Sequence, residues 1–188
     1  MRFPAEARGF IPDGAETKQT IPRGLTPEDL VTVVGPDYQQ LVDSEALSLG
    51  LIEEGESLLL NFPPPHDGSD AEYAFEGILG NAWVWIYLLR NKEAGNGEIE
   101  EAQTSEHRHL HADVRHFAEY YRILKGRMKM FLGKGEFKKE IVLDEENNHL
   151  KVPPNTFHSA KSSDIPAFVL AYAPNTSHIP REQIHLHS

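Results

Sequence analysis

The feature that most constrains the fold is a series of short strand-like segments that begins near residue 80 and continues to about residue 172. Turn-forming residues separate the segments, among them Gly126, Gly133, Gly135 and the pair Asn147–Asn148. No helical periodicity intervenes between them. Short strands at this spacing are typical of an antiparallel sandwich or barrel. The candidate strands cover residues 83–89, 104–111, 119–125, 127–132, 137–143, 150–152, 157–160 and 167–172.

The beginning of the chain has a different texture. Residues 1 to about 24 contain scattered Gly and Pro without periodicity, which indicates an irregular arm. Thr26, followed by a proline and two acidic residues, is typical of a helix start, with Thr as the N-cap and Pro at the first helical position. This helix is predicted to end at Gly35–Pro36, and a second helix is predicted over residues 37–48.

These patterns predict a mainly β protein with one principal domain. A chain of 188 residues is long enough for one ordinary hydrophobic core. The predicted organisation is an arm and helical extension over residues 1–55, a β-barrel over residues 56–178 and a C-terminal tail over residues 179–188.

Composition excludes several classes of function. The net charge of −11 argues against a nucleic-acid-binding protein, which normally carries a basic stripe. The absence of cysteine excludes thiolate catalysis, iron–sulfur clusters and Cys-type zinc sites. The apolar run over residues 82–89 is far shorter than the roughly 20 residues of a membrane helix, and the N-terminus lacks the apolar core of a secretory signal. We therefore expect a cytoplasmic protein that acts on a small molecule and binds neither nucleic acid nor membranes.

Histidines alternate with other residues at positions 107–111. Because successive side chains of a strand point to opposite faces, His107, His109 and His111 are expected to share one face. A carboxylate from the next strand, Glu119, and one more imidazole, His158, complete a nitrogen and oxygen set suited to one divalent transition metal. Iron, manganese, nickel, cobalt and zinc all accept these ligands, so the sequence predicts a metal site without selecting the metal.

The spacings around these ligands resemble the two motifs of the cupin superfamily. The motif residues are, in chain order, the histidine pair, Glu119 and Gly126, then Asn147, Pro153, Asn155 and His158. Both glycines of the family's second motif are Asn here, the non-glycine residue best suited to a left-handed turn. The resemblance covers roughly residues 80–174. It implies a double-stranded β-helix, or jelly-roll, barrel with a metal in its interior, and a homodimer.

Within this superfamily the local sequence is most similar to archaeal-type glucose-6-phosphate isomerases. The similar segments read Thr104-Ser-Glu-His-Arg-His109, Ala118-Glu-Tyr-Tyr-Arg-Ile-Leu-Lys-Gly126 and Val152-Pro-Pro-Asn-Thr-Phe-His158. Glu106 stands where that family has Gly, and the hairpin after the histidines is longer than is usual in cupins. The shorter loop favours His109 and His111 as the ligand pair. The position of Thr104 favours His107 and His109 instead.

The resemblance leaves three functions open. The first is a metal-dependent enzyme for a small polar substrate, most specifically a sugar or sugar-phosphate aldose–ketose isomerase with Glu119 or His107 as the proton-transferring group. Tyr121 shares the inward face of Glu119 and is the candidate donor to a substrate oxygen, while Lys125 is the candidate that attracts an anionic substrate. The alternatives are a non-haem iron dioxygenase and a cupin that binds a metal or ligand without turnover.

Overall fold

The computed structural model describes residues 24–64, 66, 68–108, 118–174 and 186–187. The helices are α1 (Pro27–Val33), α2 (Tyr38–Ser48) and a 3-10 turn at Gly135–Phe137. The strands are β1 (Glu72–Leu79), β2 (Ala82–Leu89), β3 (Lys92–Glu93), β4 (Ile99–Glu100), β5 (His107–Arg108), β6 (Glu119–Lys125), β7 (Arg127–Leu132), β8 (Lys139–Asp144), β9 (His149–Val152), β10 (His158–Ser162), β11 (Ala167–Pro174) and β12 (Leu186–His187). No helix among the described residues has the length and apolar character that crossing a bilayer requires.

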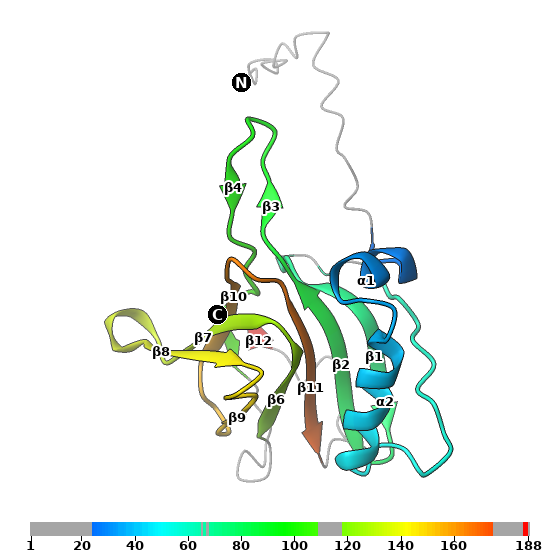
Figure 1. Cartoon of the computed structure of the whole chain (residues 1–188). Helices are drawn as coiled ribbons and strands as arrows, with labels where there is room; N and C mark the ends of the chain where they lie inside the picture. The colour runs from blue at the N-terminus through cyan, green and yellow to red at the C-terminus, as the bar shows by residue number, and fades with distance from the viewer. Residues whose placement is uncertain (1–23, 65, 67, 109–117, 175–185, 188) are drawn as a thin grey trace, which may run out of the picture.

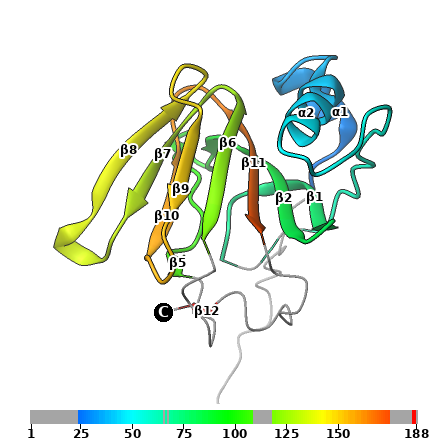
Figure 2. The ribbon, with the colours of Figure 1, turned by 90° about the horizontal axis from the view of Figure 1, so that it is seen from below.

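The strands form two five-stranded antiparallel sheets. One sheet has the order β1-β2-β11-β6-β9 and the other the order β12-β5-β10-β7-β8, while β3 and β4 form a hairpin that projects from one end (Figure 1). From β6 onward the chain passes repeatedly between the sheets, because β6, β9 and β11 belong to the first and β7, β8 and β10 to the second. Two facing sheets that share the chain in this way (Figure 2) are a double-stranded β-helix, or jelly roll. The predicted fold class is confirmed, including its short helical N-terminal extension.

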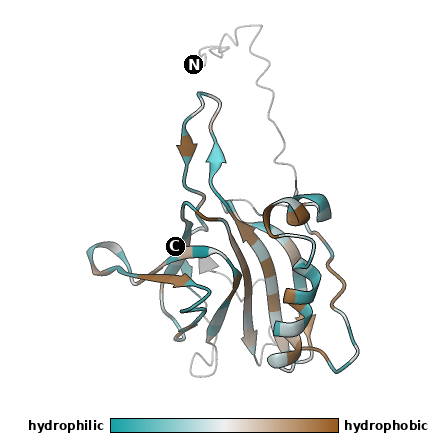
Figure 3. Cartoon of the chain, in the orientation of Figure 1, coloured by the Kyte–Doolittle hydropathy of each residue, from teal (hydrophilic) through white to brown (hydrophobic). Residues whose placement is uncertain are grey.

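The barrel has one hydrophobic cluster in its interior and a second between the first sheet and the helices, and β2 contributes side chains to both. Its side chains alternate along the strand, so that Trp85 and Tyr87 lie in the interior cluster while Val84, Ile86 and Leu88 lie in the cluster under the helices. Figure 3 shows this alternation as brown bands separated by paler ones along β2. The lumen side of this strand is therefore aromatic, and the helix side is aliphatic.

The helical extension packs on the outside of the first sheet. Leu30 of α1 and Val42 of α2 are both fully buried in the cluster under the helices, and Figure 2 shows the two helices beside β1 and β2. The predicted start of α1 is confirmed, since Thr26 Oγ1 accepts a hydrogen bond from Asp29 N at 3.2 Å and the Asp29 carboxylate accepts one from Thr26 N at 3.0 Å. Helices this short are marginal alone, so burial against the sheet stabilises them.

The turns that close the motifs differ in their backbone. Gly126 has a φ of 83°, and Asn155 takes the expected left-handed conformation with a φ of 59°. The same expectation is wrong for Asn147, which does not have a positive φ. In the described part of the chain, the non-glycine residues with positive φ are Phe62 and Asn155. Asn147 instead closes the β8–β9 turn by hydrogen bonds, from its N to Asp144 Oδ1 and from its Nδ2 to Val142 O, both at 2.9 Å.

Several parts of the strand prediction differ from the structure. Strand β1 over Glu72–Leu79 was not predicted, because a register shift between Tyr73 and Phe75 breaks the two-residue alternation on which the prediction depends. The candidate strand over residues 104–111 appears as the two-residue strand β5, and its last three residues lie outside the described residues. Residues 186–187 of the predicted tail form β12, which pairs with β5.

Gly126 allows a test of the turn between the two sheets. A Cβ atom at this position would lie 1.8 Å from Pro166 O, whereas at Gly97, with a similar φ of 81°, nothing lies within 4 Å. Gly126→Ala is expected to lower the free energy of unfolding by about 2–5 kcal/mol, from left-handed strain plus overpacking. Gly97→Ala is expected to cost about 1–2 kcal/mol from strain alone. Urea unfolding of both variants checks this, and equal losses would contradict the close approach seen at Gly126.

Candidate metal centre

Three titratable side chains meet inside the barrel. Glu119 is the first residue of β6, His158 is the first residue of β10, and His107 lies on β5 as the Cα partner of His158. Glu119 therefore comes from one sheet and the two histidines from the other. One ligand atom from each of the three lies within 4.8 Å of the others. The barrel thus brings two imidazoles and one carboxylate to a single point.

The distances within this group are short. Glu119 Oε2 lies 2.8 Å from His158 Nε2, and the rings of His107 and His158 have centroids 4.3 Å apart. Glu119 is 5% exposed and His158 is 1% exposed, so both are almost completely removed from water. A carboxylate at this depth is costly unless a cation or a hydrogen-bond donor faces it.

Backbone carbonyls orient both imidazoles in the same way. His107 Nδ1 lies 2.8 Å from Ser105 O, and His158 Nδ1 lies 2.9 Å from Thr156 O. In each case the carbonyl belongs to the residue two positions earlier. An Nδ1–H that donates to a carbonyl places the ring's lone pair on Nε2 in the neutral imidazole, which is the usual arrangement of a metal-binding histidine. The sequence analysis did not find these two anchors.

The pKa of His158 reports the balance of forces in the group. Burial by itself lowers this pKa, but the hydrogen bond that the protonated ring donates to Glu119 and the negative charge of Glu119 outweigh burial and raise the pKa above its ordinary 6.5. A proton shared between imidazole and carboxylate therefore satisfies the buried acid. A divalent cation can take the place of that proton, because metal binding requires neutral imidazole and ionised carboxylate. The donor set, its burial and its anchored rings fit a transition metal.

The structure places the other predicted residues as follows. His109 and His111, the favoured ligand pair, lie outside the described residues. The alternative ligand His107 lies beside Glu119 and His158. The Tyr121 ring lies 6.0 Å from the His158 ring, edge-on, and is 5% exposed. Burial, the charge of Glu119 and a hydrogen bond with Glu119 raise the pKa of Tyr121 well above 10. Its hydroxyl is therefore protonated at neutral pH.

Lys125 lies far from this group. It is the last residue of β6, about 20 Å along the strand from Glu119 at the usual rise per residue. Its Nζ donates to Val34 O, near the end of α1, at 2.6 Å. Lys125 thus ties the helical extension to the barrel and forms no part of the proposed site.

Sequence reasoning missed two more tyrosines of the lumen. Tyr73 of β1 and Tyr87 of β2 are Cα partners whose ring centroids lie 5.7 Å apart, and both belong to the interior cluster or pack against it. Burial and the charges of Glu76 and Glu119, partly offset by a hydrogen bond with Ser69, raise the pKa of Tyr73 to about 12. The alternation of residues 83, 85 and 87 on one strand face was the available signal for Tyr87.

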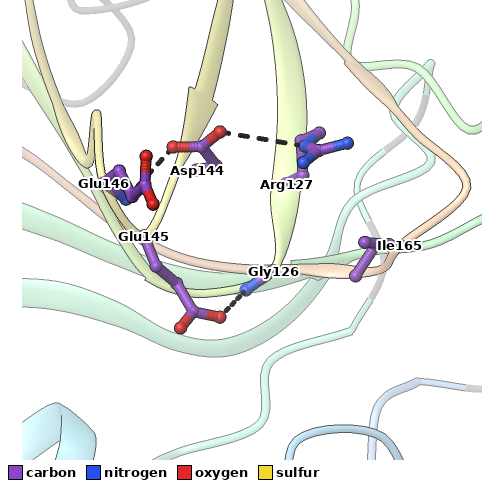
Figure 4. Close-up of a pocket in the computed structure, with 6 residues that line it drawn as sticks. All are labelled: Gly126, Arg127, Asp144, Glu145, Glu146 and Ile165. Atoms are coloured by element: carbon purple, nitrogen blue, oxygen red, sulfur yellow. Dashed lines mark hydrogen bonds and ion pairs between the residues drawn. The ribbon is translucent and has the colours of Figure 1, made fainter.

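A second concave region lies near the β6–β7 and β8–β9 turns (Figure 4). This pocket of about 280 Å³ is lined by Gly126, Arg127, Asp144, Glu145, Glu146 and Ile165. The carboxylates of Asp144 and Glu145 have structural partners. Glu145 Oε1 accepts from Gly126 N at 3.0 Å, and Asp144 Oδ1 accepts from Glu146 N at 3.1 Å. The acidic groups therefore hold the two turns together.

No family model matches the chain, and no curated protein matches its sequence. Among solved structures, it is similar to an uncharacterized conserved protein with a double-stranded beta-helix domain from Klebsiella pneumoniae, with a TM-score of 0.41 and 12% identity over 61% of this chain and 84% of the other. A cupin-like protein from Thermotoga maritima gives a TM-score of 0.34 and 19% identity over 53% of this chain and 61% of the other.

A DMSP lyase structure gives a TM-score of 0.39 and 15% identity over 57% of this chain, which spans only 44% of that protein's length. These similarities are similarities of fold. The topology of this chain, with two facing sheets that share the chain, is itself that of the cupin-type double-stranded β-helix. The fold is thereby defined as a jelly-roll barrel whose two sheets bring together three residues that can hold a metal.

Replacement of the carboxylate tests the ligand assignment. Glu119→Gln keeps the side chain's size but removes its charge, so we expect affinity for Mn²⁺, Co²⁺ or Zn²⁺ to fall about 100-fold or more. Glu140 is exposed on β8, so Glu140→Gln is the matched control and is expected to bind metal as the native protein does. Isothermal titration of metal-free protein measures both affinities. Unchanged affinity in Glu119→Gln would contradict the assignment.

The pH dependence of metal-free protein tests the His158–Glu119 pair. Because the folded-state pKa of His158 is raised, the pair stabilises the fold fully below the unfolded pKa of about 6.5 and this stabilisation is lost as pH rises through the folded pKa. The difference in free energy of unfolding between native protein and Glu119→Gln is therefore expected to shrink as pH rises from 6 upward. Urea unfolding across this range measures it, and a difference that grew with pH would be inconsistent with the pair.

Proposed function

We propose that this protein is a metal-dependent enzyme that acts on a small polar molecule, and that its reaction is the aldose–ketose isomerisation of a sugar. The observation that carries the proposal is the group formed by His107, Glu119 and His158, whose ligand atoms lie within 4.8 Å of one another and of which Glu119 and His158 are buried. The local similarity to cupin-type sugar-phosphate isomerases supports the choice of reaction.

The proposed ligands are His107, Glu119 and His158, and His109 or His111 is a further candidate. A bound divalent cation (Fe, Mn, Ni, Co or Zn) would supply a Lewis acid for adjacent carbonyl and hydroxyl oxygens of the substrate. The protein's own contribution is the fixed geometry. The carbonyls of Ser105 and Thr156 orient the imidazoles, and the burial of Glu119 and His158 strengthens electrostatic interactions around the reacting atoms.

Tyr121 is the proposed donor to a substrate oxygen. Its hydroxyl is buried beside Glu119 and remains protonated at neutral pH because its pKa is raised, so it donates a hydrogen bond rather than removing a proton. Isomerisation also needs a group that moves a proton between C1 and C2. Glu119 is a weak base once it binds a cation, so whichever of His109 and His111 does not bind the metal is the proposed acid–base group.

The charges of the barrel interior favour an uncharged sugar. Among the described residues, the buried polar and charged side chains are Glu119, His158, Ser159, Ser162 and Ser163. This set contains no Lys or Arg, and the ammonium of Lys125 is engaged with Val34 O. Lys and Arg are the usual partners of a phosphate group in a protein site. We therefore propose a free pentose or hexose ahead of a sugar phosphate.

The same ligand chemistry supports a second candidate. Two imidazoles and one carboxylate are the set that non-haem iron oxygenases use, with open positions for substrate and oxygen. An iron-dependent dioxygenase is therefore the alternative reaction at the same centre. Turnover distinguishes it, because a dioxygenase consumes oxygen and an isomerase does not.

Assay of the metal-reconstituted protein tests the proposal. We expect the protein to interconvert free aldoses and ketoses, and NMR in D₂O measures this reaction. The Glu119→Gln variant is expected to lose turnover. Tyr121→Phe is expected to lower kcat about 100-fold with intact metal binding, as for other donors to a developing oxyanion. Inactivity with pentoses, hexoses and glucose 6-phosphate would overturn the isomerase. Oxygen consumption with a catechol-like or diketone substrate would establish the alternative, and tight ligand binding without turnover would indicate a non-catalytic cupin.

A further inference from the structure

The strand that carries His107 is very short. β5 consists of His107 and Arg108, and its register with β10 is the single pair His107–His158. The anchor of each imidazole is also local, because each Nδ1 faces a carbonyl of its own segment. Such anchors orient a ring relative to its own backbone, but they do not fix the distance between the two backbones. That distance determines whether both histidines can reach one cation.

A contact on the opposite face of the strands joins the two ligand-bearing segments. Successive residues of a strand point to opposite faces, so Arg108 points away from His107. Its guanidinium carbon lies 4.5 Å from the ring centroid of Phe157, the residue before His158. Its Nη1 donates to Asn155 Oδ1 at 3.1 Å. One side chain thus holds the segment that leads into His158 at two points.

The partners of Arg108 are themselves well placed for this contact. Asn155 has the left-handed backbone of a tight turn, with a φ of 59°, which turns the chain immediately before β10. Lys134 Nζ also lies 4.6 Å from the centroid of the Phe157 ring. Two cations therefore contact the ring that precedes His158.

We propose that Arg108 is a positioning residue for the metal centre. By holding β5 against the Asn155–Phe157 turn, Arg108 sets the distance between His107 and His158. This inference rests on the proposed metal site. Arg is suited to the task because a planar guanidinium stacks on a ring while it donates in its own plane, which an ammonium cannot do.

The direction in which loss of Arg108 changes metal affinity distinguishes a positioning role from a purely electrostatic one. Arg108 adds a positive charge near the site, and a nearby positive charge opposes the binding of a cation. If Arg108 acted only through its charge, its removal would raise metal affinity. If it positions the ligands, its removal lowers affinity, because contacts behind metal ligands typically change affinity 10- to 100-fold.

Binding of Co²⁺ to full-length protein, purified without nickel affinity, tests the proposal. Arg108→Ala is expected to lower Co²⁺ affinity about 10-fold or more in competition with a chelator, and to shift the visible absorption of the bound ion. Arg108→Lys is expected to recover only part of this loss. Asn155→Gly removes the acceptor while tolerating positive φ, and is expected to give a smaller loss.

Lys161 provides the matched control. It lies on β10 itself, with its Nζ 5.9 Å from the Phe131 ring centroid, so Lys161→Ala removes a contact of the same kind farther along the strand from His158. We expect native affinity and absorption. Thermal unfolding of each metal-free variant reports folding, and if Arg108→Ala does not fold, Arg108→Lys and Asn155→Gly make the same test.

Two results would overturn the inference, and they are distinguishable. Native protein that binds Co²⁺, with Arg108 variants that bind it equally or more tightly and with the same absorption, would refute the positioning role alone. Native protein that fails to bind Co²⁺ would refute the metal centre and the inference together.

Discussion

The contact between Glu119 Oε2 and His158 Nε2, at 2.8 Å and almost without exposure to water, is the interaction on which the rest of the site depends. It joins the two sheets, because Glu119 begins β6 in one and His158 begins β10 in the other. Buried ion pairs are weak sources of stability, since desolvation offsets their attraction. A buried acid and base between the two sheets are therefore better explained by a ligand that both can bind.

The fold supplies what this pair requires. The repeated passage of the chain between two sheets places the ends of β5, β6 and β10 together, and carbonyls of Ser105 and Thr156 set the rings. Gly126 allows the turn from β6 to β7 to pass close to Pro166 O, so that consecutive strands can belong to opposite sheets. The lumen face of β2 and β6 adds aromatic and phenolic side chains, while α1 and α2 cover the aliphatic outer face.

Much of this could be predicted from the sequence where side-chain identity carries the signal. The bounds of β6 and β7 follow from the alternation on either side of Gly126, and Glu119 and His158 follow from the motif spacings. Strand β1 could not be found because its register shift destroys the alternation. The carbonyl anchors are backbone groups without a sequence signature, and the stacking of Arg108 on Phe157 joins residues far apart in the chain. The position of Lys125 depends on where α1 packs, which no local pattern gives.

The central claim is that imidazoles and one acid from facing sheets hold one cation inside this barrel. Elemental analysis of protein purified without an affinity metal tests that claim most directly, because it needs neither a substrate nor an assumed reaction. The account predicts one iron, manganese, nickel, cobalt or zinc ion per chain after dialysis. Protein that retains no transition metal, and takes up none from a mixture of these ions, would contradict it.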